Sequence, residues 1–171
     1  MAVKGALIAL LLFAVFSGAH QFQGKAMEGR ALTYPLAALI VPLGWWLWGR
    51  RDSRLYPYAL DIFLVLPFLI DTAGNALDLY DTIDWWDDFN HLLNWGLLTA
   101  ACGQLLLRYP LGRLNVVSLA IGFGAVTALL WEIGEYYTFI RGGPEEQTAY
   151  TDTLGDMTLG LVGSVVRRSL R

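Results

Sequence analysis

Long runs of apolar residues, separated by short polar stretches, set the pattern of this chain. A helix that crosses a bilayer needs about 20 mostly apolar residues, and six windows meet or approach that length. They are residues 3–19, 31–48, 55–74, 89–107, 114–137 and 150–166. The pattern predicts an all-α fold, a polytopic membrane helical bundle of about six transmembrane helices that forms one integral membrane domain over residues 1–171.

Composition supports lipid as the solvent. Hydrophobic types make up 56% of the 171 residues and charged types only 16%, whereas soluble domains carry about a quarter charged residues. No basic cluster with interleaved aromatics occurs, which argues against nucleic acid as a partner. The single cysteine, Cys102, lies in an apolar window and excludes an internal disulfide.

The first window admits a second interpretation, a cleaved signal peptide. Lys4 precedes an apolar stretch, and Ser17 and Ala19 have the small side chains and the spacing of a cleavage site.

The basic residues predict the orientation, because cytoplasmic loops carry an excess of lysine and arginine. With six spans and both termini in the cytoplasm, most basic residues fall on the inner side: Lys4, Arg50, Arg51, Arg54, Arg108, Arg113, Arg167, Arg168 and Arg171. Only Lys25, Arg30 and Arg141 remain outside. The acids take the opposite side, since all except Asp52 and Asp61 fall at outer helix ends or in outer loops.

Four of the predicted helices each carry a pair of polar side chains three or four residues apart at the outer end. The pairs are Asp71 with Asn75, Asp87 with His91, Glu132 with Glu135, and Asp152 with Asp156. Residues at this spacing share one helix face. Ionisable groups within a membrane usually face the bundle interior and indicate function, so we expect these pairs to converge.

A converging set of carboxylates without a nearby lysine or arginine repels itself unless a cation compensates the charge. Carboxylates and imidazoles on facing helices are the usual ligands of metal sites in helix bundles. We therefore predict a divalent ion (Zn, Mn, Fe or Mg, which the sequence does not distinguish) bound by Asp87, His91, Asp152 and Asp156, with Asp71 as a further candidate. Glu132 and Glu135 are the candidate catalytic residues, acting as base or as further ligands. The alternative for each acid is an ordinary helix cap or a hydrogen-bonded structural role.

Three motifs follow one another: Trp86-Asp-Asp-Phe-Asn-His91, Trp131-Glu-Ile-Gly-Glu-Tyr136 and Asp152-Thr-Leu-Gly-Asp-Met157. In this order they resemble the YjdF-like family of bacterial inner-membrane proteins, a domain of unknown function. The resemblance implies a multi-pass protein of the bacterial cytoplasmic (inner) membrane. The polar positions of that family fall on Asp87, His91, Glu132, Glu135, Asp152 and Asp156. The resemblance implies no reaction.

Three functions fit these features. The first is a metal-dependent hydrolase or transferase acting on a lipid or lipid-linked substrate at the outer leaflet. The second is a cation or metal transporter, with Asp61 continuing a path inward, in a protein that forms homo-oligomers. The third is a small accessory subunit of a larger membrane complex.

The predicted topology can be checked by labelling introduced cysteines. In intact cells we expect an impermeant maleimide to label Asp84→Cys, in an outer loop, and to reach Tyr109→Cys, in an inner loop, only after permeabilisation. The unsubstituted protein, with Cys102 in an apolar window, is the control. Labelling of Tyr109→Cys in intact cells would reverse the orientation.

Overall fold

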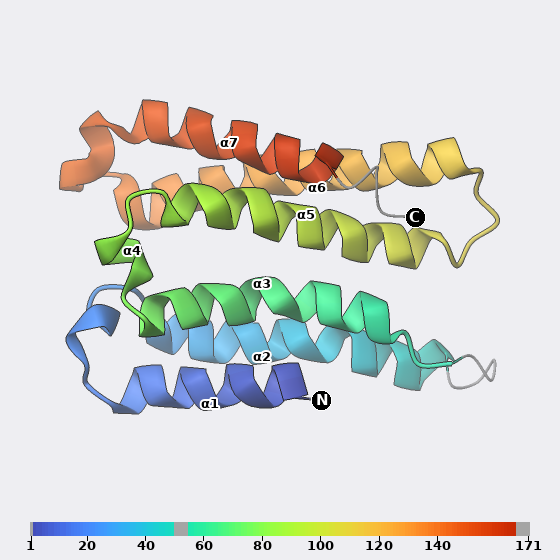
Figure 1. The fold of residues 1–171 in the computed structure, drawn as a ribbon, viewed down its shortest axis with the longest axis horizontal. Helices are drawn as coiled ribbons and strands as arrows, with labels where there is room; N and C mark the ends of the chain where they lie inside the picture. The colour runs from blue at the N-terminus through green and yellow to red at the C-terminus, as the bar shows by residue number, and fades with distance from the viewer. Residues whose placement is uncertain (1, 50–54, 167–171) are drawn as a thin grey trace. The chain divides into compact units, whose positions relative to one another are not determined.

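The helices of this protein form two compact units, Met1–Trp86 and Asp87–Arg171. The structure is a computed structural model that describes residues 2–49 and 55–166, and over these residues it contains helices and no strand. A long helix lies at each of the six predicted windows, and consecutive long helices within each unit run antiparallel (Figure 1). The all-α prediction is confirmed, while a single membrane domain and six full spans stay predictions.

The first unit contains three long helices. They are α1 (Ala2–Phe16), α2 (Met27–Gly44), which continues as a π-helix over Trp45–Gly49, and α3 (Tyr58–Ala76). A 3₁₀ turn (His20–Phe22) follows α1, and the short α4 (Leu79–Thr82) follows α3. The first helix ends before Gly18, whose φ of +64° favours glycine. His20, within the 3₁₀ turn, lies beyond this helix end.

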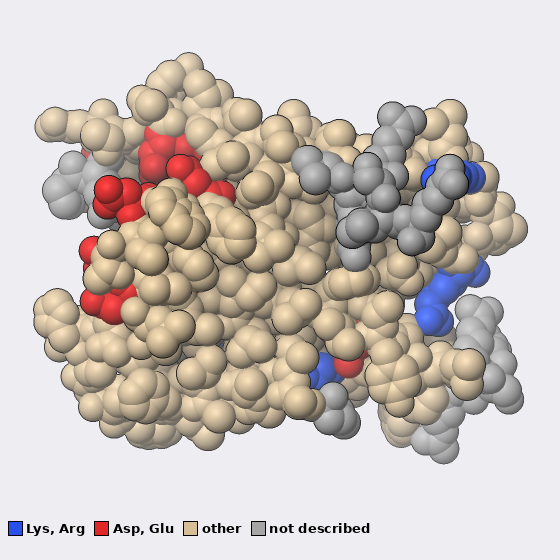
Figure 2. All heavy atoms as spheres, in the orientation of Figure 1, with Lys and Arg blue, Asp and Glu red and all other residues tan. Residues whose placement is uncertain are grey.

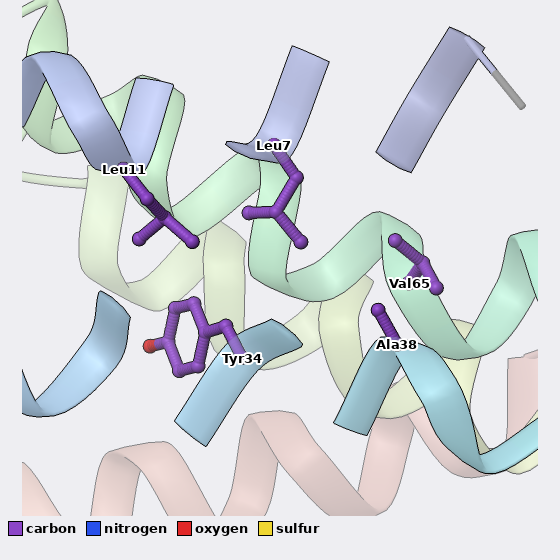
Figure 3. Packing of buried hydrophobic residues seen from close by; sticks show 5 residues of the cluster. All are labelled: Leu7, Leu11, Tyr34, Ala38 and Val65. Atoms are coloured by element: carbon purple, nitrogen blue, oxygen red, sulfur yellow. The ribbon is translucent and has the colours of Figure 1, made fainter. Parts of the chain in front are cut away.

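The core of the first unit lies where α1 contacts both α2 and α3. Leu7 and Leu11 of α1 pack against Tyr34 and Ala38 of α2 and against Val65 of α3 (Figure 3). Leu7 and Val65 are fully buried. Because Leu7 and Leu11, like Tyr34 and Ala38, are four residues apart, α1 and α2 each turn one apolar stripe inward.

Two ion pairs join the helices of the first unit. Lys4 of α1 lies 2.7 Å from Asp61 Oδ1 of α3, and the Tyr56 hydroxyl donates to Asp61 Oδ2 at 2.6 Å. Arg30 of α2 forms an ion pair with Asp71 of α3. The sequence offered no partner for Asp61, and the pairing with Lys4 corrects that view, because only helix packing brings residues this far apart in the chain together.

The second unit is built from α5 (Trp86–Leu106), α6 (Arg113–Glu135) and α7 (Ala149–Val166). A π-turn (Tyr136–Ile140) and a 3₁₀ turn (Pro144–Gln147) connect α6 to α7. Small residues let the backbones approach closely: the Gly163 backbone lies against the Leu92 carbonyl, and Gly124 lies against Thr99 and Ser164. Thr99 donates to Ser164 Oγ at 3.0 Å, which joins α5 to α7 at this level.

The helix surfaces are those of a membrane protein. Among the residues that the structure describes, three helical stretches are long and apolar enough to span a bilayer: Met27–Gly49, Tyr58–Ala76 and Arg113–Glu135. Ala2–Phe16 is a shorter apolar helix. Large apolar side chains stand exposed on α2 (Leu36 59%, Ile40 59%) and on α6 (Val126 57%, Leu130 59%). Contiguous exposed apolar surface of this kind is unfavourable in water and expected in lipid.

Six of the basic residues that predict the orientation lie outside the described residues. They are Arg50, Arg51, Arg54, Arg167, Arg168 and Arg171. The cytoplasmic location of both termini therefore stays a prediction.

The close approach of α5 and α7 predicts a specific sensitivity. Gly163→Ala should lower the stability of the second unit by about 1–3 kcal/mol, because the new methyl group would meet the rigid backbone at Leu92. Gly122→Ala is the matched control, since nothing lies within 4 Å of its added Cβ. Thermal unfolding in detergent measures both variants, and equal melting temperatures would contradict the packing.

Candidate functional site

Acidic side chains gather at one end of the second unit, where α5 and α7 begin and α6 ends (Figure 2). Basic side chains of this unit appear at its opposite end, by the connection from α5 to α6. Asp87 lies in the first turn of α5 and Asp152 in the first turn of α7. The partial positive charge of a helix N-terminus stabilises acids at such positions. Glu132 lies in the last turn of α6, so the N-terminus of its own helix does not stabilise its negative charge.

His91 is the centre of the cluster. Its Nδ1 lies 3.4 Å from Glu132 Oε1 of α6. Its Nε2 lies 3.8 Å from Asp87 Oδ2 of the same helix and 3.9 Å from Asp156 Oδ1 of α7. The two ring nitrogens thus approach different carboxylates, contributed by all three helices of the unit.

Burial makes this arrangement costly. His91 is 8% exposed, Asp156 4% and Glu132 2%. Within the part of the chain that the structure describes, His91 Nδ1 and Glu132 Oε1 are buried and have no hydrogen-bond partner. No lysine or arginine among these residues forms an ion pair with Glu132 or Asp156. A buried charge without a partner costs several kcal/mol, so the cluster as it stands favours a cation.

A layer of close packing lies one helical turn deeper than the cluster. Trp95 follows His91 by four residues, Ala128 precedes Glu132 by four, and Gly160 follows Asp156 by four. A Cβ on Gly160 would lie 2.8 Å from Trp95 Cδ1 and 3.0 Å from Ala128 Cβ, so the three residues are packed together. Trp95 is buried. This layer separates the cluster from the Thr99–Ser164 pair below it.

An open pocket of about 550 Å³ lies on the other side, toward the helix ends. Its lining consists of Asp88, Thr148, Thr151, Asp152 and Gly155. Asp88 is adjacent to Asp87, and Asp152 precedes Asp156 by one turn on α7. The pocket therefore gives polar, solvent-accessible space beside the buried cluster.

The structure brings most of the predicted site residues together. Asp87, His91 and Asp156 form one group whose ligand atoms lie within 4.8 Å of one another, and His91, Glu132 and Glu135 form a second. Asp152 lines the adjacent pocket. Each of the three polar pairs of the second unit thus contributes to one region, as the helical spacing predicts.

Asp71 belongs to the first unit and has its own partners there. It pairs with Arg30 and accepts hydrogen bonds from Tyr34 (2.7 Å), Tyr80 (2.9 Å) and Asn75 (3.4 Å). The expectation that no arginine lies near the acids is wrong for this residue. Its role as a metal ligand stays a prediction.

Two further polar residues on α5 were not singled out from the sequence. Asn90 is 3% exposed, and its Oδ1 accepts a hydrogen bond from Asn94 Nδ2 at 3.3 Å. Asn90, His91 and Asn94 follow Asp87 by three, four and seven residues, so all four side chains lie on one face of α5. This helical spacing is the sequence feature from which Asn90 and Asn94 could have been predicted to lie beside His91.

Comparison with known proteins identifies a family. The family model described as "Predicted membrane protein (DUF2238)" matches residues 2–170. No curated protein and no solved structure matches. The expectation of a membrane-protein family of unknown function is confirmed, and the narrower YjdF-like name is not part of that match.

The repulsion within the cluster predicts the effect of removing one charge. In protein stripped of metal with a chelator, Glu132→Gln should unfold at a higher temperature than the unsubstituted protein, because the amide removes a buried carboxylate that has no cation partner. Glu146→Gln, which changes an exposed carboxylate of the same unit, should not raise the unfolding temperature. A lower melting temperature for Glu132→Gln would show that the carboxylate is structurally satisfied.

Proposed function

The chain belongs to the DUF2238 family of predicted membrane proteins, and from this premise we propose that it is a metal-dependent membrane enzyme whose metal centre is the His91 cluster. The observation that carries this proposal is the pair of buried atoms without hydrogen bonds, His91 Nδ1 and Glu132 Oε1, within a set of converging carboxylates. Buried polar atoms without partners, inside a set of converging carboxylates, are typical of a site that a bound cation completes.

The proposed ligands are Asp87, His91 and Asp156, with Asp152 one turn above in the pocket. One imidazole and several carboxylates suit a divalent ion such as zinc, manganese, iron or magnesium. The separations of 3.8 and 3.9 Å from His91 Nε2 are close to those of two ligands on a shared ion. A small rotation of Asp87, whose side chain is half exposed, would complete the approach.

The proposed reaction is hydrolysis or group transfer on a lipid or lipid-linked substrate. A bound divalent ion lowers the pKa of water and polarises an ester or phosphoester oxygen. Glu135 or Glu132 accepts the proton that the attacking water or hydroxyl loses. The pocket beside Asp152 accommodates the polar headgroup, while exposed apolar helix faces keep the site within reach of lipid.

We place the protein in the bacterial cytoplasmic membrane as a multi-pass protein with this site at the outer leaflet. That orientation is supported by the distribution of lysine and arginine in the sequence. The narrower YjdF-like assignment belongs to the same proposal and is supported by the three ordered motifs.

Two observations favour an enzyme over a transporter. Asp61, which a transport path would need as an available acid, is paired with Lys4 and Tyr56. The packed layer of Trp95, Ala128 and Gly160 closes the second unit beneath the cluster. A self-contained cluster also argues against a purely accessory subunit, although homo-oligomers or partner subunits remain compatible with the enzyme.

Metal content tests the centre itself. Protein purified in mild detergent should contain at least one equivalent of a divalent metal by elemental mass spectrometry, and His91→Ala and Asp156→Asn should lose it. Asp84→Asn, an exposed acid in the first unit, is the matched control and should retain it. A metal-free unsubstituted protein that stays metal-free after incubation with zinc or manganese, while all variants fold, would defeat the metal centre.

Turnover tests the reaction. Metal-loaded protein in mixed micelles of bacterial lipids should release headgroup or acyl products, and Glu135→Gln should slow this release at least tenfold while keeping the ion bound by Asp87, His91 and Asp156. Bound metal without turnover on any lipid or lipid-linked substrate would favour a binding or transport function.

A further inference from the structure

We propose that the cluster holds two divalent cations that the His91 imidazole bridges, one at Nε2 with Asp87 and Asp156 and one at Nδ1 with Glu132 and Glu135. This inference rests on the proposed metal centre and extends it, because the second ion gives Glu132 and Glu135 a role as ligands.

The geometry divides the cluster into two groups. Each group contains three residues whose ligand atoms lie within 4.8 Å of one another, and the groups share only His91. The ring presents Nε2 to Asp87 and Asp156 and presents Nδ1 to Glu132. Because the lone-pair directions of the two ring nitrogens diverge, a single ion cannot be bound by both.

The contact between His91 and Glu132 is short without being a hydrogen bond. A histidine that ligates a metal usually donates its second N–H to a carboxylate, which orients the ring. Glu132 Oε1 lies 3.4 Å from Nδ1, yet both atoms lack a hydrogen-bond partner within the described chain. Two ligands that are each about 2.1 Å from one ion lie roughly 3–3.5 Å apart. The observed separation therefore fits shared coordination.

Charge supports the same conclusion. Each group contains one buried carboxylate, Asp156 in the first and Glu132 in the second, and neither forms an ion pair with a lysine or arginine of the described residues. The acids of the second group lie at the end of α6, away from the helix N-termini that stabilise Asp87 and Asp152. A second ion at Glu132 balances the charge where burial is greatest.

Binding the second ion has a consequence for protons. An imidazole that ligates through both nitrogens carries no N–H, so its remaining ring proton passes to water when the second ion binds. The protein therefore releases one more proton than carboxylate ligation alone requires.

Stoichiometry is the decisive measurement. Chelator-stripped full-length protein in detergent is dialysed to equilibrium against Mn²⁺ alone, and the bound ion is counted by elemental mass spectrometry. We expect two ions per chain in the unsubstituted protein, and one each in Glu132→Gln and Asp156→Asn. His91→Ala should lose both, and the control Glu146→Gln should keep both.

The electron paramagnetic resonance spectrum of bound Mn²⁺ gives a second readout. Two ions joined through one ring couple to each other and broaden the six-line signal, and Glu132→Gln should restore the sharp lines of a single ion. Thermal unfolding of each variant confirms that it is folded before its metal is counted.

The outcomes separate this inference from the proposed function. One ion in the unsubstituted protein, whether or not Glu132→Gln weakens its binding, would overturn the bridged pair and make Glu132 an orienting residue for His91. Loss of every ion in both Glu132→Gln and Asp156→Asn would also overturn it, because that shows a single shared site. No ion in any protein would defeat the metal centre itself.

Discussion

A charged side chain inside a helix bundle surrounded by lipid must be compensated, and this constraint shapes both units of the protein. In the first unit the compensation comes from within the chain. Lys4 pairs with Asp61 and Arg30 pairs with Asp71, so each acid of α3 meets a cation from a neighbouring helix. In the second unit the described residues supply no such cation for Glu132 or Asp156. This difference in charge compensation is the basis of the proposal that the second unit binds a cation.

Four-residue spacing builds the second unit in layers. On α5 the series is Asp87, His91, Trp95 and Thr99, and on α7 it is Asp152, Asp156, Gly160 and Ser164. Glycine and serine on α7 let its backbone approach α5 and α6 closely. Because the glycine at the Trp95 layer leaves room for an indole ring, the polar layer is closely packed on this side, and the pocket lies toward the helix ends.

The packed layer of Trp95, Ala128 and Gly160 affects how much water can reach the carboxylates. Carboxylates are strong ligands and bases where water is limited, and the layer beneath the cluster limits it on one side. The pocket at the helix ends is lined by polar groups from Asp88, Asp152 and two threonines. The exposed apolar faces of α2 and α6 show that lipid is the surrounding solvent. A site that opens at a helix end, next to lipid, suits a substrate with an apolar tail.

The sequence by itself determined the helices and the polar pairs, because both follow from local periodicity. Runs of apolar residues located all six long helices, and three- or four-residue spacing placed His91 with Asp87 and Asp156 with Asp152. The same rule extends to Asn90 and Asn94, which were not singled out. Only the tertiary structure decided which residues pair across helices: Asp61 with Lys4, Asp71 with Arg30, and each nitrogen of His91 with a different carboxylate. Those contacts join residues distant in the chain, so they depend on how helices rotate and approach one another, and no short-range pattern encodes that packing.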